Sequence, residues 1–454
     1  MISIIILLLI LIIMLFACYL FFRREIISPT FICIAMYVLS LFLMIFYCDK
    51  WQVDLSFTTY AAIIIALVSL AAGEFLGTRV AVYSGLRKSY STVDKENIER
   101  QKENGIIISN KTVMICLIFT VLTAVLYFQE IRKIAANSAY AQSVYGQAYS
   151  FLMQVRWAKT LEGTEVSYYV QHMYTCCGAI AVVFAYVILF NKINRLHKNG
   201  RYLFMYITIA LYIGISFMTT GRAQMLNFFV YIIFAWIILI AKKRAWRFGN
   251  NIKLFVKAIM IIAVAFLLFY LAGLLTEKSL HYDNFFDNFA NYFSSSVYTL
   301  NEYLNNPADF SSATDFFGCH TLSGIYSFLR TLGFSIPDSV VALEYIYCGD
   351  YLTNIYTPLR RYIQDFGWLG MSLIMFIMGY GYKRLIWRNK RDNSGGLDVI
   401  FEAYFMFPLV YIAIEERLFM DVIMIRSIYQ VIYIVMIYQW VINRKFFTKK
   451  IRLY

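Results

Sequence analysis

Arginines beside acids at the ends of apolar segments are the residues of this 454-residue chain best suited to chemistry. In the segment 354–370 (NIYTPLRRYIQDFGWLG), Arg360 and Arg361 precede Asp365, and Arg361 and Asp365 are spaced to share one face of a helix. Two adjacent guanidinium groups can bind a diphosphate through forked, charge-assisted hydrogen bonds. The alternative is a structural ion pair between Arg361 and Asp365 that orients the helix.

A further arginine lies in a short turn between two apolar segments, Thr220-Gly221-Arg222. Arg222 comes just before the next helix, whose N-terminal end is dipole-positive, so a cation there is unfavourable unless an anion shares the site. We therefore expect Arg222 to bind an anion. The alternative is an arginine that extends to the lipid headgroups.

The turn between the last two apolar segments contains Glu416 and Arg417, and Arg426 follows inside the last segment. A cation buried in a membrane is costly, so an arginine at that position is a candidate functional residue. A structural pair between Arg426 and Asp421 or Glu416 is the alternative.

Three side chains are candidate general bases: Asp365, Glu416 and His320. The chain has 4 histidines and no HExxH spacing, so we expect no metal site. It has no GxxxxGK[ST] or GxSxG motif, and we expect no cofactor. Cys319 and Cys348 lie in one long loop and are candidates for a disulfide.

Helices that cross a membrane must position these residues. The chain is 61% hydrophobic and 18% aromatic, with mean hydropathy +0.62, which is typical of an all-α, polytopic membrane protein. About eleven segments are long and apolar enough to span a bilayer, at roughly 2–22, 29–47, 57–77, 112–130, 169–190, 202–218, 224–241, 254–275, 366–382, 397–414 and 420–440.

The loop charges predict the orientation of these spans. With the N-terminus outside, inner loops hold about 29 of the 41 Lys and Arg, and the outer side holds about 18 of the 27 acids. The C-terminus is then cytoplasmic. The +14 net charge suits contact with anionic membrane lipids and does not indicate a nucleic-acid partner. The first apolar run, ending in Arg23-Arg24, is interpreted as a span and not as a cleaved signal peptide.

Three regions follow from this threading: residues 1–275 with eight spans, a large outer loop at 276–365, and residues 366–454 with three spans and a basic tail. A loop of this length is typically functional. We expect short helices at 321–333 and 338–347, and a helix start at Thr357-Pro358, where Thr caps and Pro occupies the first helical position. Gly367 and Gly370 permit close backbone approach.

The chain resembles the Wzy-type oligosaccharide repeat-unit polymerases of bacterial inner membranes. The likeness rests on Thr220-Gly221-Arg222 after a span, the late outer loop, Asn354-Ile-Tyr-Thr357, and the run from Tyr362 to Gly370. The resemblance implies joining of lipid-linked repeat units for surface polysaccharide (O-antigen, capsule or exopolysaccharide), and a chain-length regulator as a partner. It also implies that arginines of two outer loops matter, which corresponds to Arg222 and to Arg360 or Arg361.

Residues and resemblance lead to one hypothesis. The diphosphate of an undecaprenyl-linked donor is bound by outer cations, while Asp365, Glu416 or His320 takes a proton from the acceptor sugar. The candidate substrate-binding residues are Arg222, Arg360, Arg361, Tyr362, Arg417 and Arg426. Two alternatives stay open: a ligase-type glycosyltransferase, since related ligases often rely on a loop histidine, and a flippase or exporter that moves lipid-linked sugars without chemistry.

Overall fold

The computed structural model describes residues 1–81, 105–138, 151–194, 202–221, 223–246, 285–310, 316–390 and 395–443. They are mainly helical and divide into two compact units. The first comprises residues 1–93, 284–394 and 405–427, and the second comprises residues 94–283, 395–404 and 428–454.

The first unit contains all the candidate residues except Arg222. Its elements are α1 (Ile2–Phe21), α2 (Pro29–Ile45), α3 (Phe57–Ala81), α12 (Phe285–Asn305), the 3-10 turn η3 (Pro307–Phe310), α13 (Ser323–Thr331), β1 (Ile346–Cys348), β2 (Tyr351–Thr353), α14 (Pro358–Asn389), α16 (Phe407–Tyr411) and the π-helical turn η4 (Leu418–Val422). β1 and β2 pair antiparallel, with Cys348 opposite Tyr351.

The second unit is a helical bundle. It is made of α5 (Asn110–Asn137), α7 (Phe151–Leu161), α8 (Tyr168–Ile193), α9 (Tyr202–Met218), α10 (Ala223–Lys243), α15 (Gly396–Tyr404), most of α17 (Ile425–Tyr438) and the π-helical turn η5 (Gln439–Asn443). α5 packs on α8 and α9, and α10 packs on α8 and α15. Most of α8 is buried, which fits the central member of a bundle.

The all-α architecture is confirmed, and the apolar helices are compatible with a membrane-spanning protein, but the expected number of eleven spans is not confirmed. Among the described residues, six helices are long and apolar enough to cross a membrane: α1, α3, α5, α8, α10 and residues Ile425–Ile442. α2 and α9 are apolar but shorter. The expected span 366–382 lies within α14, and the expected span 254–275 lies outside the described residues.

One expected span differs from the structure. Residues 397–414 do not form a continuous helix, because α15 ends at Tyr404 and α16 begins at Phe407, with Pro408 in its first turn. A proline lacks the N–H that a continuing helix needs and clashes with the preceding turn, so its position accounts for the break.

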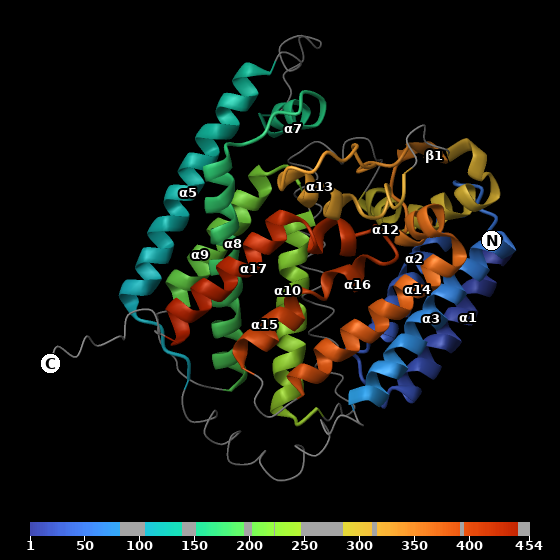
Figure 1. Cartoon of the computed structure of the whole chain (residues 1–454), viewed down its shortest axis with the longest axis horizontal. Helices are drawn as coiled ribbons and strands as arrows, with labels where there is room; N and C mark the ends of the chain where they lie inside the picture. The colour runs from blue at the N-terminus through green and yellow to red at the C-terminus, as the bar shows by residue number, and fades with distance from the viewer. Residues whose placement is uncertain are drawn as a thin grey trace. The chain divides into compact units, whose positions relative to one another are not determined.

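α14 is the longest described helix of the first unit, and Figure 1 shows it running alongside α3. Two glycines make this close packing possible. A Cβ added at Gly73 would lie 1.9 Å from the carbonyl oxygen of Phe376, and one added at Gly379 would lie 2.1 Å from that of Leu70. The backbones of α3 and α14 therefore meet where neither helix carries a side chain, as small residues allow in membrane helices.

α14 begins at the position that the sequence predicted, directly after Thr357. Thr357 precedes the helix and Pro358 occupies its first turn, although the Thr357 hydroxyl makes no capping hydrogen bond. Gly367 then interrupts the helix with φ 66° and ψ −174°. A residue with a side chain is strained at this φ, so glycine permits the kink that separates the polar first turns from the apolar remainder.

The late loop contains more structure than the sequence predicted. The expected helix at 321–333 is confirmed as α13, but the one at 338–347 is wrong, because this segment is non-helical and ends in β1. α12 was not predicted. Its Asn301 amide accepts from the Ser56 N–H at 2.8 Å and donates to the Asp54 carbonyl at 3.0 Å, which ties the late loop to the loop before α3.

A buried ionic network joins the C-terminal half of α14 to α3 and to the α1–α2 connection. The Lys383 ammonium donates to Glu25 at 2.8 Å and to Glu74 at 3.0 Å, and Lys390 pairs with the other oxygen of Glu25. The second Glu74 oxygen accepts from the Ser28 hydroxyl at 2.8 Å and from the Thr30 N–H at 3.1 Å. The two acids and two lysines thus satisfy one another. The sequence did not predict this network.

Candidate functional site

His320 and Asp365 form a buried pair at the start of α14. The His320 Nδ1 lies 2.9 Å from Asp365 Oδ1, and each side chain is only 3% exposed. Since an ionised carboxylate only accepts, the hydrogen-bond network assigns the imidazole proton to Nδ1. Nε2 is then the nitrogen with the lone pair, and no described residue hydrogen-bonds to it. Two of the three candidate bases, His320 and Asp365, are therefore hydrogen-bonded to each other.

Backbone N–H groups of the segment before α13 hold the Asp365 carboxylate in place. The Thr321 N–H donates to Oδ2 at 2.6 Å, and the His320 N–H donates to the same oxygen at 3.1 Å. Burial alone would raise the pKa of Asp365, but the hydrogen bonds from His320 and Thr321 outweigh it and hold this pKa below its ordinary value. Asp365 is therefore ionised, and it faces a histidine whose ring it orients.

Arg361 organises the loop around this pair. Its Nη1 donates to the carbonyl of His320 at 2.6 Å and to that of Val340 at 2.9 Å, and its Nη2 donates to Val341 at 2.8 Å. These contacts use three of its five N–H donors, and the other two bond to no described residue. The alternative pairing of Arg361 with Asp365 is therefore not observed, because Asp365 pairs with His320 instead.

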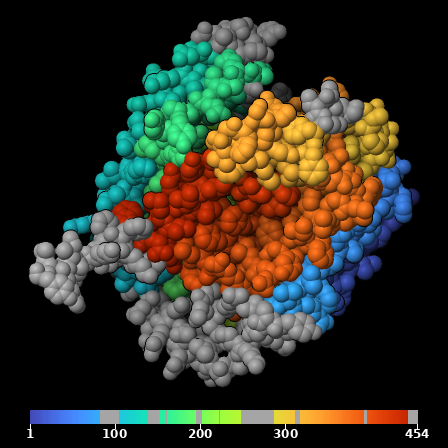
Figure 2. Space-filling view, viewed as in Figure 1, coloured from blue at the N-terminus to red at the C-terminus, as the bar shows by residue number. Residues whose placement is uncertain are grey.

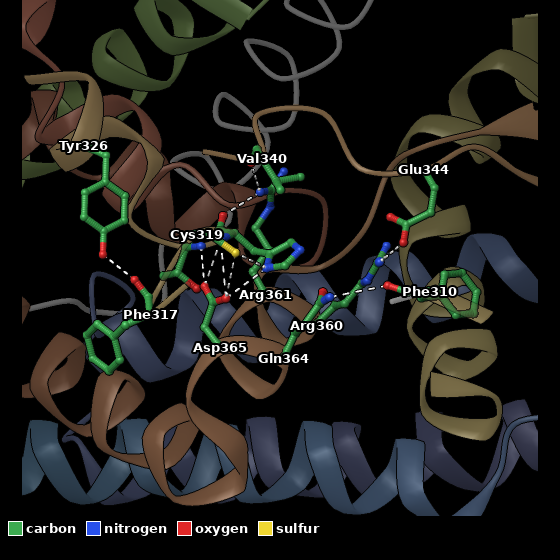
Figure 3. Close-up of polar contacts among 12 residues, drawn as sticks. Phe310, Phe317, Cys319, Tyr326, Val340, Glu344, Arg360, Arg361, Gln364 and Asp365 are labelled. Carbon is green, nitrogen blue, oxygen red and sulfur yellow. Dashed lines mark hydrogen bonds and ion pairs between the residues drawn. The ribbon is translucent and has the colours of Figure 1, made fainter. Parts of the chain in front are cut away.

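Arg360 points away from its neighbour. Figure 3 shows Arg361 directed toward Val340, whereas Arg360 extends toward Glu344. Its Nη2 donates to Glu344 Oε1 at 2.6 Å, and its guanidinium lies 3.9 Å from the ring centroid of Tyr356, with Tyr303 and Phe310 also packed against it. Arg360 is fully buried, and this cation–π enclosure gives it a packing role.

Glu416 occupies a structural position of its own. One oxygen accepts from the N–H groups of Leu418 and Phe419, each at 2.9 Å, and from the Tyr362 hydroxyl at 3.1 Å. The other oxygen accepts from the Met420 N–H at 2.9 Å. Burial raises the pKa of Glu416 above its ordinary value, although these hydrogen bonds oppose the shift. The Glu416 carboxylate therefore caps the N-terminus of η4. The Tyr362 hydroxyl donates to the same carboxylate, so both side chains stabilise this turn.

The remaining candidate cations lie elsewhere. Arg417 bonds to Glu415 and, at 3.0 Å, to Asp421, and its guanidinium lies 5.3 Å from the Tyr411 ring centroid. Asp421, an expected partner of Arg426, thus pairs with Arg417. Arg426 is half-buried in the first turn of α17. Arg222 lies outside the described residues.

The Cys319 thiol lies beside the pair and is not oxidised. Its Sγ is 3.0 Å from His320 Nδ1, and it donates to Asp365 Oδ1 at 3.9 Å. Cys348 is a free, fully buried thiol, so the candidate disulfide between Cys319 and Cys348 is absent. Figure 3 shows Cys319 and Asp365 directed toward each other beside Arg361.

The arrangement matches that of a general base. A carboxylate on Nδ1 fixes the tautomer and favours the imidazolium that forms when Nε2 accepts a proton.

In Figure 2 the loop residues before α14, in light orange, form a continuous surface with the orange segment that follows them. The sequence named both His320 and Asp365 but did not predict that they pair, and it gave no indication of Thr321, Val340 or Val341, which act through their backbone groups.

Comparison of the chain with protein-family models, curated proteins and solved structures found no match.

Proposed function

We propose that this protein is a glycosyltransferase that polymerises oligosaccharide repeat units carried on undecaprenyl diphosphate, at the outer face of the bacterial cytoplasmic membrane. The observation that carries the proposal is the buried His320–Asp365 pair, with 2.9 Å between Nδ1 and Oδ1. A base oriented in this way is what a sugar hydroxyl needs to become a nucleophile. A flippase needs no such base, and so the pair favours an enzyme.

In the proposed reaction, a hydroxyl of the acceptor unit attacks the anomeric carbon of the donor. The bond from that carbon to the diphosphate oxygen breaks, a new glycosidic bond forms, and the hydroxyl proton passes to His320 Nε2. Asp365 stays ionised and stabilises the imidazolium. Because both side chains are 3% exposed, the reaction takes place where bulk water is largely excluded, which limits hydrolysis of the donor.

The leaving diphosphate requires cations, and the contacts rank the candidates. The charge of Arg360 is paired with Glu344 and that of Arg417 with Glu415 and Asp421, although Arg360 Nε and Nη1 and Arg417 Nε make no hydrogen bond within the described part of the chain. Arg361 lies next to the proposed base and has two N–H donors that bond to no described residue. We therefore assign leaving-group stabilisation first to Arg361, with Arg222 and Arg426 as further candidates, since preorganised cations lower the barrier where charge develops.

Purified protein in detergent tests this proposal with a defined lipid-linked repeat unit, in the presence of EDTA and without nucleotide. We expect products of increasing length on a gel, because the bond to the diphosphate supplies the driving force. A preparation that does not lengthen the substrate, but moves it across the bilayer of reconstituted vesicles, would show that the protein is a flippase.

A ligase-type transferase is the second candidate, and the buried loop histidine is the observation that favours it. Ligase and polymerase chemistry share the donor and the base and differ in the acceptor. The same assay distinguishes them: a polymerase joins two identical lipid-linked units, whereas a ligase elongates only when a different acceptor is supplied.

The proposal also requires the late loop to face outward, as the distribution of loop charges suggests. A cysteine introduced at Asp309 should then react with a membrane-impermeant thiol reagent in intact spheroplasts. Reaction of a cysteine at Lys95 instead would reverse the orientation and remove the site from the outer face.

A further inference from the structure

The side chains around His320 have a second chemical capacity. Cys319 Sγ, His320 Nδ1 and a carboxylate oxygen of Asp365 all lie within 4.8 Å of one another. The separations are 3.0 Å from sulfur to nitrogen, 2.9 Å from nitrogen to oxygen and 3.9 Å from sulfur to oxygen. In tetrahedral zinc coordination, neighbouring ligand atoms lie about 3.3–3.6 Å apart. Shifts of well under an ångström would therefore create three ligand positions.

The chemistry of these donors selects the metal. A thiolate, an imidazole and a carboxylate together favour Zn²⁺ over the hard cations Mg²⁺ and Ca²⁺, which prefer oxygen alone. One thiolate and one carboxylate also balance the two charges of the ion. This balance matters because Cys319 is 1% and His320 2% exposed, and a site with net charge would be costly at that depth.

Hydrogen bonds from neighbouring groups already orient these three candidate ligands. The N–H groups of His320 and Thr321 hold Asp365 Oδ2, which leaves Oδ1 directed at the imidazole. Arg361 fixes the carbonyl of His320 at 2.6 Å. Hydrogen bonds of this kind around the ligands strengthen metal binding. Among the residues that the structure describes, no other group of three His, Cys, Asp or Glu side chains brings its ligand atoms together in this way.

We propose that Cys319, His320 and Asp365 bind a Zn²⁺ ion, with water as the fourth ligand, and that the metal-bound protein does not transfer sugars. The second half of this proposal rests on the proposed function. Binding releases the thiol proton of Cys319 to solvent, and the single proton of the neutral His320 imidazole moves from Nδ1 to Nε2 by exchange with solvent. An imidazole bound to metal through Nδ1 carries its proton on Nε2, so that nitrogen can no longer accept one. Metal binding and base function thus exclude each other.

Metal binding is measured directly on purified full-length protein in detergent. We expect about one Zn²⁺ to stay with each chain after gel filtration, and Co²⁺ to give a thiolate charge-transfer band that Zn²⁺ removes. Cys319→Ser should lose the band and bind Zn²⁺ at least about 10-fold more weakly. The matched control is Cys348→Ser, which changes another fully buried cysteine of the same loop and should bind like the wild type.

A wild type that retains no Zn²⁺ and shows no Co²⁺ band would overturn the site, as would a Cys319→Ser protein that binds both ions normally. Asp365→Asn covers the case in which Cys319→Ser does not fold. It keeps the thiolate, so the band should persist at saturation while the Co²⁺ affinity falls. Unchanged affinity in that variant would also contradict the proposed ligand set.

The regulatory half is tested by elongation of the lipid-linked repeat unit in Zn²⁺ or in EDTA. We expect Zn²⁺ to slow the wild type at least about 10-fold and EDTA to restore it. The elongation rate of Cys319→Ser in Zn²⁺ should stay close to the rate of the same variant in EDTA, whatever that rate is. Unchanged elongation by a wild type with bound Zn²⁺ would overturn this half. Absence of elongation even in EDTA would count against the proposed function, while the binding measurements would still decide the metal site.

Discussion

The two halves of α14 each hold buried charged side chains, but they satisfy them differently. In the C-terminal half, Lys383 and Lys390 face Glu25 and Glu74, and all four carboxylate oxygens have a donor. Before the kink at Gly367, Asp365 orients His320, whose Nε2 bonds to no described residue.

This difference separates a structural cluster from a chemical one. A buried ion network whose members are all paired has no group left to react, and removal of one partner leaves an unpaired buried charge. A carboxylate that fixes only one nitrogen of an imidazole leaves the other able to accept a proton. The two regions are alike in burial and charge. They differ in whether every polar atom of the charged side chains has a hydrogen-bond partner.

The largest effect on stability should come from the C-terminal cluster. Lys383→Met leaves Glu25 and Glu74 without their shared cation, and we expect a loss of about 3–5 kcal/mol. The measurement is the amount of folded protein and its thermal midpoint in detergent. Adding Glu74→Gln should restore part of the loss, because it removes the acid whose cation is lost, while Glu25 keeps its pair with Lys390. A Lys383→Met protein as stable as the wild type would contradict the structural role of this cluster.

The same cluster should make the stability of the folded protein depend on pH in the acidic range. Burial alone would raise the pKa of Glu25, but Lys390 and Lys383 lower it from 4.5 to about 2. Its contribution is therefore complete above the ordinary pKa and is lost as the pH falls toward 2, by up to about 3 kcal/mol. Thermal midpoints of the wild type and Glu25→Gln across acidic pH should converge as the pH falls. Parallel curves would contradict the pairing.

For the His320–Asp365 pair, we expect the main effect of a substitution to be on the rate of elongation. Asp365→Asn should slow elongation by about 10²-fold or more, because an amide can present its N–H₂ group to His320 and favour the wrong tautomer. The control is Asp338→Asn, which alters a fully exposed acid of the same loop. Steady-state rates with a defined donor measure the difference. Equal rates for the wild type and Asp365→Asn would remove Asp365 from the mechanism.

A smaller effect should follow from a change in packing between the two clusters. Gly379→Ala places a Cβ 2.1 Å from the Leu70 carbonyl oxygen and forces α3 and α14 apart, at a cost of about 1–3 kcal/mol. Gly381→Ala is the matched control, since a Cβ at Gly381 meets no atom within 4 Å. Equal thermal midpoints for the two variants would show that the helices do not pack as closely as described.

The sequence predicted the helical architecture better than the site. Apolar length alone indicated α1, α3, α5, α8 and α10, because a spanning segment is a local property of about 20 residues. α12 carried a signal that was missed: Phe289, Phe293, Val297 and Leu300 recur at helical spacing among polar residues. Its polar residues made it resemble a loop, yet many of them are buried.

The polar contacts could not be predicted, since their partners lie far apart in the chain. Asp365 meets a residue 45 positions earlier, and Lys383 meets one 309 positions earlier. The sequence also treated Arg360 and Arg361 as one pair. Successive residues of a helix point in directions about 100° apart, so the two guanidinium groups entered different environments.

The central claim is that His320 takes the proton from the acceptor sugar. The most direct test is the rate of elongation by His320→Gln, measured in EDTA with saturating donor and acceptor. We predict a rate lower by about 10²–10⁴-fold, with the thermal midpoint and donor binding close to those of the wild type. Elongation by a folded His320→Gln protein at a rate within a few-fold of the wild type would contradict the account.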